Sequence, residues 1–175
     1  MSNIKIRDVN LSDAARLAEI YSYYVKNTAI SFEYDAPDEK EFSQRISSIQ
    51  KNFPYICIEE DGRITGYAYA SKFHPRAAYS HCAELSIYIE KNSKKKGFGK
   101  LLYEELQNRL EKLGILNLYA CIGVPEVPDE YLDFNSQHFH EHLGFKTVGL
   151  FHKCGRKFNR WYNMIWMEKL IGVHE

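Results

Sequence analysis

The stretch from Ser93 to Leu106, SKKKGFGKLLYEEL, combines residue types that bind anions. Three lysines precede a Gly-Phe-Gly, and an apolar pattern with helical spacing begins at Phe98. The first amides of a helix have no partner within it and the helix dipole favours negative charge there, so such a loop can bind phosphate. Gly97 and Gly99 allow a ligand to approach the backbone more closely than a Cβ would.

Two common phosphate-binding motifs are absent from this stretch. The pattern G-x-x-x-x-G-K-[ST] does not occur, and no third glycine follows Gly99 at the spacing of a dinucleotide-binding loop. Lysines beside a turn also form ordinary solvated surface. Taken alone, the stretch therefore leaves a phosphate site and a plain surface turn both open.

Glu84 and His140 are side chains that could transfer protons. Glu84 begins an alternating run, AELSIYIE, on the polar face that also carries Ser86 and Tyr88. It could act as a general base or form an ion pair at a strand edge. His140 has an ordinary pKa near 6.5, so it could donate or accept a proton, or make a structural hydrogen bond inside a helix.

The sequence does not support a metal site. His138 and His142 would share a helical face, but His140 points to another face and no H-E-x-x-H pattern completes a ligand set. The four cysteines are scattered without C-x-x-C spacing and without a recognisable nucleophile setting, which predicts independent thiols. They are Cys57, Cys82, Cys121 and Cys154.

The composition predicts one globular domain over residues 1–175. The chain has 45% hydrophobic residues and equal numbers of basic and acidic side chains, 23 each, so no global field favours nucleic acid or a membrane surface as a partner. The N-terminus lacks the apolar core of a signal peptide, and no apolar run reaches the length of a membrane span. We therefore expect a cytoplasmic protein.

The elements that must position these side chains alternate between strands and helices. Asp61-Gly62 between two extended runs predicts a hairpin, and Gly114 is a plausible helix end. Two final strands are expected to join near Gly155. Strands are predicted at 4–7, 55–60, 64–73, 83–90, 116–122, 145–153 and 160–169, and helices after the capping candidate Ser12, after Pro37, from Phe98 to Gly114 and from Ser136 to Leu143. This order predicts an α/β fold on a mixed, mostly antiparallel sheet.

Lys94 to Gly99 resembles the pyrophosphate loop of the GNAT superfamily, the acetyl-CoA-dependent N-acetyltransferases, whose loop reads [Q/R]-x-x-G-x-[G/A]. Lys94 stands where glutamine or arginine is usual. Further blocks resemble the phosphinothricin acetyltransferase-like subfamily. They are TAISFEYDAPD, GYAYASKFHPRAAYSHCAELSIYIEKNSKKKGFGKLLYEEL, SQHFHEHLGF and GRKFNRWYN, in the subfamily's order along nearly the whole chain.

The resemblance implies the GNAT fold, with helices flanking the sheet, and it implies roles for particular residues. Glu84 would be the catalytic base and His140 would protonate the leaving thiolate. Phe32, Glu33, Arg76 and Tyr79 would bind the acceptor. The residues expected to bind acetyl-CoA are Leu85, Ser86, Ile87, Tyr88, Ile89, Lys94, Lys95, Lys96, Gly97, Phe98, Gly99, Lys100, Asn135 and Ser136.

Three departures from the subfamily concern the acceptor side. Asp133 stands where an asparagine usually precedes the serine by three positions. The acidic segment from Gly123 to Phe134 is longer than expected and could remodel the acceptor pocket or attract a cationic amine. Asn159 and Asn163 replace a glycine and an aspartate.

The resemblance implies transfer of an acetyl group from acetyl-CoA to the primary amine of a small, amino-acid-like acceptor, in a homodimer. Because no cysteine lies in a recognisable nucleophile setting, we expect the transfer to be direct. Two alternatives remain open from the sequence. The acceptor could instead be a polyamine, an aminoglycoside-like molecule or a peptide amine. The chain could also be an acyl-CoA-binding module without turnover.

Overall fold

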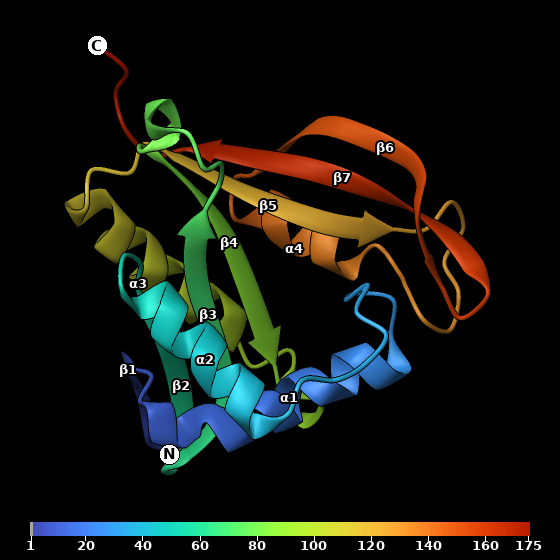
Figure 1. Cartoon of the computed structure of the whole chain (residues 1–175), viewed down its shortest axis with the longest axis horizontal. Helices are drawn as coiled ribbons and strands as arrows, with labels where there is room; N and C mark the ends of the chain where they lie inside the picture. The colour runs from blue at the N-terminus through green and yellow to red at the C-terminus, as the bar shows by residue number, and fades with distance from the viewer. Residues whose placement is uncertain (1) are drawn as a thin grey trace.

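The computed structural model describes residues 2–175 and contains seven strands and four helices in one chain (Figure 1). The strands are β1 (Ile4–Asp8), β2 (Tyr55–Glu60), β3 (Arg63–Lys72), β4 (Cys82–Ile89), β5 (Asn117–Val124), β6 (Lys146–Lys157) and β7 (Arg160–Leu170). The helices are α1 (Ala14–Asn27), α2 (Glu39–Gln50), α3 (Phe98–Lys112) and α4 (Asn135–His142). Short 3-10 turns occupy Leu11–Asp13, Ala77–Tyr79 and Lys91–Ser93.

All seven strands form one sheet in the order β1-β2-β3-β4-β5-β7-β6. Every neighbouring pair is antiparallel except β4 and β5, which are parallel. The predicted mixed, mostly antiparallel sheet is therefore confirmed. Within the part of the chain that the structure describes, no helix is both long enough and apolar enough to cross a bilayer.

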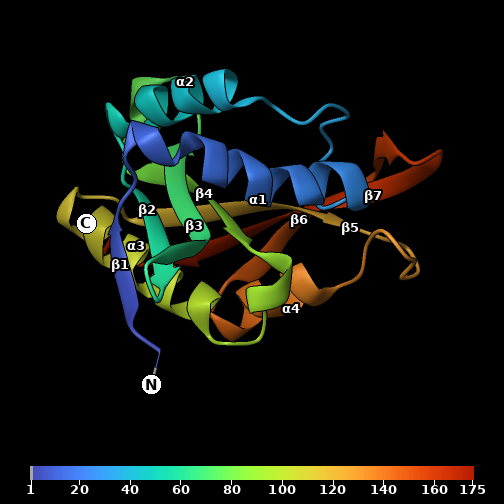
Figure 2. The ribbon, with the colours of Figure 1, turned by 90° about the horizontal axis from the view of Figure 1, so that it is seen from below.

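Helices cover the sheet on both faces, with α1 and α2 on one side and α3 and α4 on the other (Figure 2). The alternation along β4 explains the two layers, because successive side chains point to opposite faces. Leu85 and Ile87 join the core that contains the α3 stripe of Leu102, Leu106 and Leu110. Tyr88, on the opposite face, packs against the core built from α1 and α2.

The parallel pair β4–β5 is joined over only a few residues and then separates. Its register covers Cys82 to Glu84 against Asn117 to Tyr119, although β4 continues to Ile89 and β5 to Val124. The two strands diverge towards their carboxyl ends (Figure 1). Past Glu84, the edge of β4 that faces β5 therefore has no partner strand.

Two of the predicted chain reversals are confirmed. Asp61 and Gly62 both have positive φ, 53° and 80°, and connect β2 to β3 as a tight hairpin. Gly114 has a φ of 78° directly after α3, and the amide of Ile115 bonds the carbonyl of Leu110.

Two local predictions are wrong. The helix after Ser12 begins at Ala14 behind a 3-10 turn, and it is the carboxylate of Asp13 that accepts a bond from the amide of Asn10 at 2.8 Å. The last hairpin turns at Phe158 and Asn159, whose φ values are 48° and 60°, and Gly155 lies inside β6. Both corrections arise because turn residues other than serine and glycine can supply the required bond or backbone conformation.

Candidate active site

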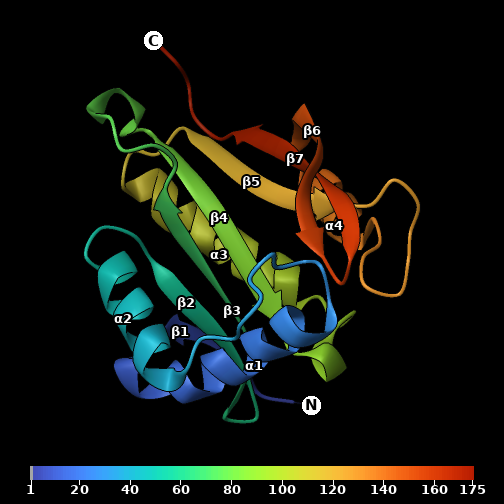
Figure 3. The same cartoon turned by 45° about the vertical axis from the view of Figure 1, so that its right-hand side comes forward.

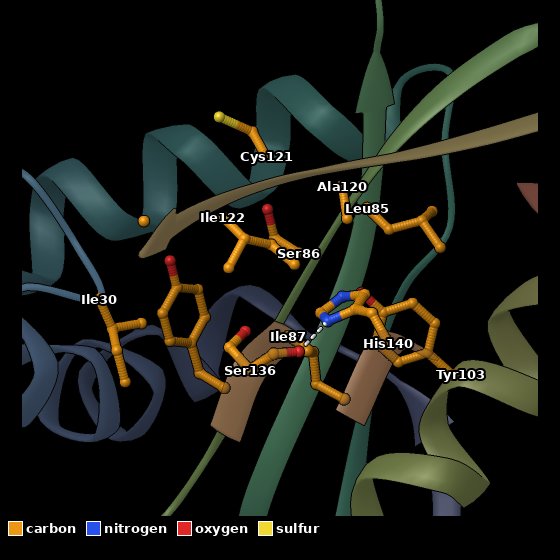
Figure 4. Close-up of a pocket in the computed structure, with 12 residues that line it drawn as sticks. Ile30, Leu85, Ser86, Ile87, Tyr103, Ala120, Cys121, Ile122, Ser136 and His140 are labelled. Carbon is orange, nitrogen blue, oxygen red and sulfur yellow. Dashed lines mark hydrogen bonds between the residues drawn. The ribbon is translucent and has the colours of Figure 1, made fainter. Parts of the chain in front are cut away.

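A cavity of about 70 Å³ lies where β4 and β5 separate (Figure 4). Ser86, Ile87 and Tyr88 of β4 form one wall, and Ala120, Cys121 and Ile122 of β5 form the other. Tyr103 from α3 and Ser136 and His140 from α4 also line it. Residues of β4 and of α4, which are far apart in the sequence, therefore line the same cavity.

His140 is buried, with 3% of its surface exposed, and both ring nitrogens are engaged. Nδ1 lies 2.7 Å from the carbonyl oxygen of Ser136, which can only accept, so Nδ1 carries the hydrogen. Nε2 lies 2.7 Å from the hydroxyl of Tyr103, which therefore donates to the neutral ring. Burial lowers the pKa of His140, and the bond to Ser136 raises it only partly, so the ring is neutral at pH 7.

Glu84 is half-buried on β4, opposite Ser71 of β3 and beside Tyr119 of β5. Burial raises the pKa of its carboxyl group. Among residues 2–175, no side chain forms an ion pair or a hydrogen bond with this carboxylate. The ion-pair alternative for Glu84 is therefore not realised, and a desolvated carboxylate with a raised pKa is suited to accept a proton.

The Gly-Phe-Gly stretch forms the loop before α3. Lys95 and Gly97 both have positive φ, 64° and 83°, and Gly97 is the residue that caps the helix. A Cβ on Gly97 would meet no atom within 4 Å, so the surface above this turn is open. A Cβ on Gly99 would lie 3.0 Å from the ring of Phe139 on α4, so this glycine allows α3 and α4 to pack closely.

The lysines of this loop differ in their surroundings. Lys96 bonds Glu60 of β2 through its ammonium group at 2.7 and 2.9 Å, and Lys100 lies 3.7 Å from Glu104. Lys94 lies over the ring of Tyr24, 5.0 Å from its centroid. Lys95 is exposed and has no ion pair within the described chain. Lys95 and the free amides of α3 are thus better placed to meet an anion than Lys96.

The loop that carries Phe32 and Glu33 bridges the two halves of the sheet, running from α1 towards β6 and β7 (Figure 3). Phe32 stacks on Tyr162 and lies against Gly155, where a Cβ would come within 2.4 Å of its ring. Glu33 accepts bonds from Arg45 of α2 at 2.8 and 3.1 Å and from Tyr21 at 2.9 Å. These two predicted acceptor residues are therefore held in place by the protein itself.

Arg76 and Tyr79 lie in the segment between β3 and β4. Arg76 is exposed and precedes the 3-10 turn, and Tyr79 packs on Phe73 and His74. Phe73 in turn stacks on Tyr119 of β5 with ring centroids 4.2 Å apart. This aromatic group lies next to Glu84, because Glu84 and Tyr119 are register partners.

Most charges of the acidic segment Gly123–Phe134 are paired. Arg160 bonds Glu130 at 2.8 and 2.9 Å and lies 3.0 Å from Asp129, and Lys153 lies 3.5 Å from Glu126. The segment therefore offers less net negative charge to a cationic amine than its sequence indicates. Asp133 accepts a bond from the amide of Asn135 at 2.9 Å and so helps to begin α4.

Three residues of the site escaped the sequence analysis. Tyr103 belongs to the apolar stripe of α3, and Arg45 to a polar surface of α2. Lys157 is 3% exposed and donates to the carbonyl of Ser31 at 2.6 Å. A buried tyrosine hydroxyl or lysine ammonium group needs a polar partner. The presence of a tyrosine in the apolar stripe of α3 and of a lysine within the predicted final hairpin was therefore the sequence feature that could have indicated these residues.

Across residues 2–175 no group of three or more histidine, cysteine or acidic side chains is placed to hold a metal ion. All four cysteines are free thiols. Cys121 lines the cavity, and desolvation of its thiol raises the pKa to about 11, so the thiol is protonated near neutral pH.

The site thus combines a separated parallel strand pair, a glycine loop before a helix that can bind phosphate, and a carboxylate that can accept a proton. Residues 6–166 match the family model described as an acetyltransferase (GNAT) domain, and the chain belongs to that family. It is an acetyl-CoA-dependent N-acetyltransferase.

The proteins that this chain is similar to include members of the subfamily that the sequence indicated. The phosphinothricin N-acetyltransferase of Alcaligenes faecalis is 31% identical over 169 residues, covering 96% of this chain and 83% of the relative. The L-amino acid N-acyltransferase of Escherichia coli (strain K12) is 28% identical, covering 94% and 92%. The crystal structure of a phosphinothricin acetyltransferase from Sinorhizobium meliloti in complex with AcCoA has 36% identity and a TM-score of 0.88, covering 97% and 89%.

Proposed function

We propose that this enzyme acetylates the primary amine of a small, amino-acid-like acceptor by direct transfer. The observation that carries the proposal is Glu84, a half-buried carboxylate without a partner in the described chain, next to the point where β4 and β5 separate. Named relatives act on phosphinothricin or on L-amino acids, which are small amines of this class. A protonated thiol with a raised pKa, such as that of Cys121, is a poor nucleophile, which supports direct transfer.

Acetyl-CoA supplies an acetyl thioester, and two parts of the chain fit it. The unpaired edge of β4 from Leu85 to Ile89 offers backbone groups that no neighbouring strand occupies. The open turn at Gly97 and the first amides of α3 offer a place for phosphates. We assign Lys95 and Lys100 to this phosphate end and give Lys96 a structural role with Glu60.

Protons would move through Glu84 beside the cavity, whereas Tyr103 and His140 line the cavity itself. Glu84 accepts the proton of the acceptor ammonium group, directly or through water. His140 is neutral and accepts a bond from Tyr103, so we assign it the positioning of that hydroxyl. The departing thiolate would take its proton from water, because the hydroxyl hydrogen of Tyr103 is donated to His140 and burial raises the pKa of Tyr103.

The test of this function is a panel of amines with acetyl-CoA, followed by release of free thiol. We expect release with amino-acid-like amines and a fall in kcat of at least about 100-fold for Glu84→Gln, within the usual range for a general base. Equal rates for wild type and Glu84→Gln across pH would refute the base assignment. An effect confined to KM would give Glu84 a binding role instead.

We also propose a homodimer in the cytoplasm. The outer strands β6 and β7 expose apolar side chains, among them Val148, Phe151 and Trp161 at 52%, 49% and 57% of their surfaces. Exposed apolar side chains on outer strands are compatible with a contact between subunits, and the four free thiols suit a reducing compartment. Light scattering should give twice the 20.5 kDa of one chain, and a monomer at micromolar concentration would contradict the dimer.

A further inference from the structure

A second cavity lies between α2 and the sheet, on the face of the sheet that carries Glu84. Its volume is about 240 Å³. Aromatic rings from two helices and three strands make up most of its lining, namely Tyr21, Phe42, Tyr55, Tyr67, Tyr69 and Tyr88. Because a cavity of about 150 Å³ is enough to hold benzene, this one can receive a group of that size.

The lining contains a polar atom without a partner. Tyr67 has 0% of its surface exposed, and its hydroxyl has no hydrogen-bond partner among residues 2–175. Leaving such a group buried and unpaired costs about 1–3 kcal/mol. A ligand oxygen or sulfur that enters the cavity and accepts this hydrogen would recover that cost.

The cavity adjoins the proposed reaction site. Tyr88 lines both this cavity and the one between β4 and β5. Tyr69 is the register partner of Ser86, and the charge of Glu84 contributes to raising the pKa of Tyr69, after burial. An amine bound at Glu84 therefore has the second cavity within reach of its side chain.

The charge at the cavity is already balanced. Arg45 lines it, and the guanidinium group bonds Glu33 at 2.8 Å and Glu41 at 2.5 Å. With two carboxylates on one guanidinium, the local charge is not positive. An anionic side chain would find no free cation here, whereas an uncharged one avoids the repulsion.

We propose that this cavity receives the side chain of the acceptor amine, and that the preferred side chain is uncharged, about the size of a benzene ring, and carries a hydrogen-bond acceptor. The proposal rests on the acetyltransferase function proposed above and specifies its substrate class. It separates this enzyme from acetyltransferases whose acceptor has an anionic side chain.

The experiment compares thiol release with acetyl-CoA for L-tyrosine, L-alanine and L-glutamate. We expect kcat/KM for L-tyrosine to exceed the other two by at least about tenfold, a modest value for a filled apolar pocket. Ile49→Phe, which adds volume from α2 into the cavity, should reduce kcat/KM for L-tyrosine far more than for L-alanine.

Tyr67→Phe tests the buried hydroxyl, and Tyr23→Phe is its matched control, because Tyr23 is partly buried on α1 but does not line the cavity. We expect Tyr67→Phe to lower kcat/KM for L-tyrosine about tenfold and Tyr23→Phe to leave it near the wild-type value. Thermal melting and calorimetric binding of acetyl-CoA confirm that each variant is folded.

The outcomes distinguish the two proposals. Thiol release that favours L-alanine or L-glutamate, or a ranking that Ile49→Phe leaves unchanged, overturns the side-chain site and leaves the acetyltransferase proposal standing. Absence of thiol release with every amine, in a protein that binds acetyl-CoA, overturns both. An L-tyrosine preference that Ile49→Phe abolishes supports the side-chain site.

Discussion

Glu84 is held half-buried without a counter-ion within the described chain, although a paired carboxylate would be more stable. Burial raises the pKa of this group in the folded state, so the folded chain binds the proton more tightly than the unfolded chain does. Stability from this group therefore increases as the pH falls through the folded-state pKa, and above that pKa the charged carboxylate costs stability. The catalytic role that we propose for Glu84 would explain why the sequence retains this cost.

Glu84→Gln should consequently raise the melting temperature at pH 7 while it lowers activity. We expect a rise of about 1–3 °C, because removal of a desolvated charge recovers under about 1 kcal/mol and each kcal/mol shifts a chain of this length by ~2–4 °C. The rise should vanish at acidic pH, where Glu84 is protonated. Calorimetry at several pH values measures both effects.

Glu90→Gln is the matched control on the same segment. Burial raises the pKa of Glu90, but the bonds and charges of Arg16 and Arg63 outweigh it, so the pKa is lowered overall. Its stabilisation is present at neutral pH and is lost as the pH falls through the folded-state pKa. This variant should melt about 2–4 °C lower at pH 7, a loss of about 1 kcal/mol. A lower melting temperature for Glu84→Gln as well would contradict the account of Glu84.

At the scale of elements, the periodic patterns and the tight turns were predictable. The α3 stripe, the Asp61-Gly62 hairpin and the Gly114 helix end depend on neighbouring residues only, and the structure contains all three. The role of Gly155 was not predictable, because its need for a small side chain comes from Phe32, more than 120 positions away. The partners of Lys96 and Tyr103 likewise come from β2 and α4.

Substitutions in the loop before α3 should affect the binding of acetyl-CoA. Gly97 and Gly62 have nearly the same φ, 83° and 80°, and a Cβ at either position would meet no atom within 4 Å. Substitution of either glycine by alanine should therefore cause backbone strain but no steric clash. Each variant should lose about 1–2 kcal/mol. Only Gly97→Ala should also raise the KM for acetyl-CoA, by about tenfold, which corresponds to ~1.4 kcal/mol.

Steady-state kinetics with acetyl-CoA as the varied substrate measures the difference between these two variants. Equal KM values for Gly97→Ala and Gly62→Ala would show that the turn at Gly97 has no part in binding the cosubstrate. The β2–β3 hairpin lies outside the proposed site, so Gly62→Ala controls for the loss of stability alone.

On the scale of the whole molecule, the segment Ala29 to Tyr34 joins the two halves of the separated sheet. On the α1–α2 side, Tyr21 and Arg45 bond Glu33. On the other side, Tyr34 donates to the carbonyl of Arg156 at 2.7 Å, and Lys157 donates to Ser31. The sequence placed Phe32 and Glu33 near the acceptor through a resemblance only, since these contacts link positions that no local pattern relates.

Gly155→Ala should therefore disturb the acceptor side without disturbing the acetyl-CoA side. The new Cβ would lie 2.4 Å from the ring of Phe32, and overpacking of this kind costs about 1–3 kcal/mol, or ~2–12 °C of melting temperature. Displacement of Phe32 should lower kcat/KM for the acceptor about tenfold and leave the KM for acetyl-CoA unchanged. Gly149→Ala, on the same strand, places its Cβ 3.7 Å from Phe151 and should change neither. If both variants behave alike, the segment binds no acceptor through Phe32, and its contacts with β6 serve stability alone.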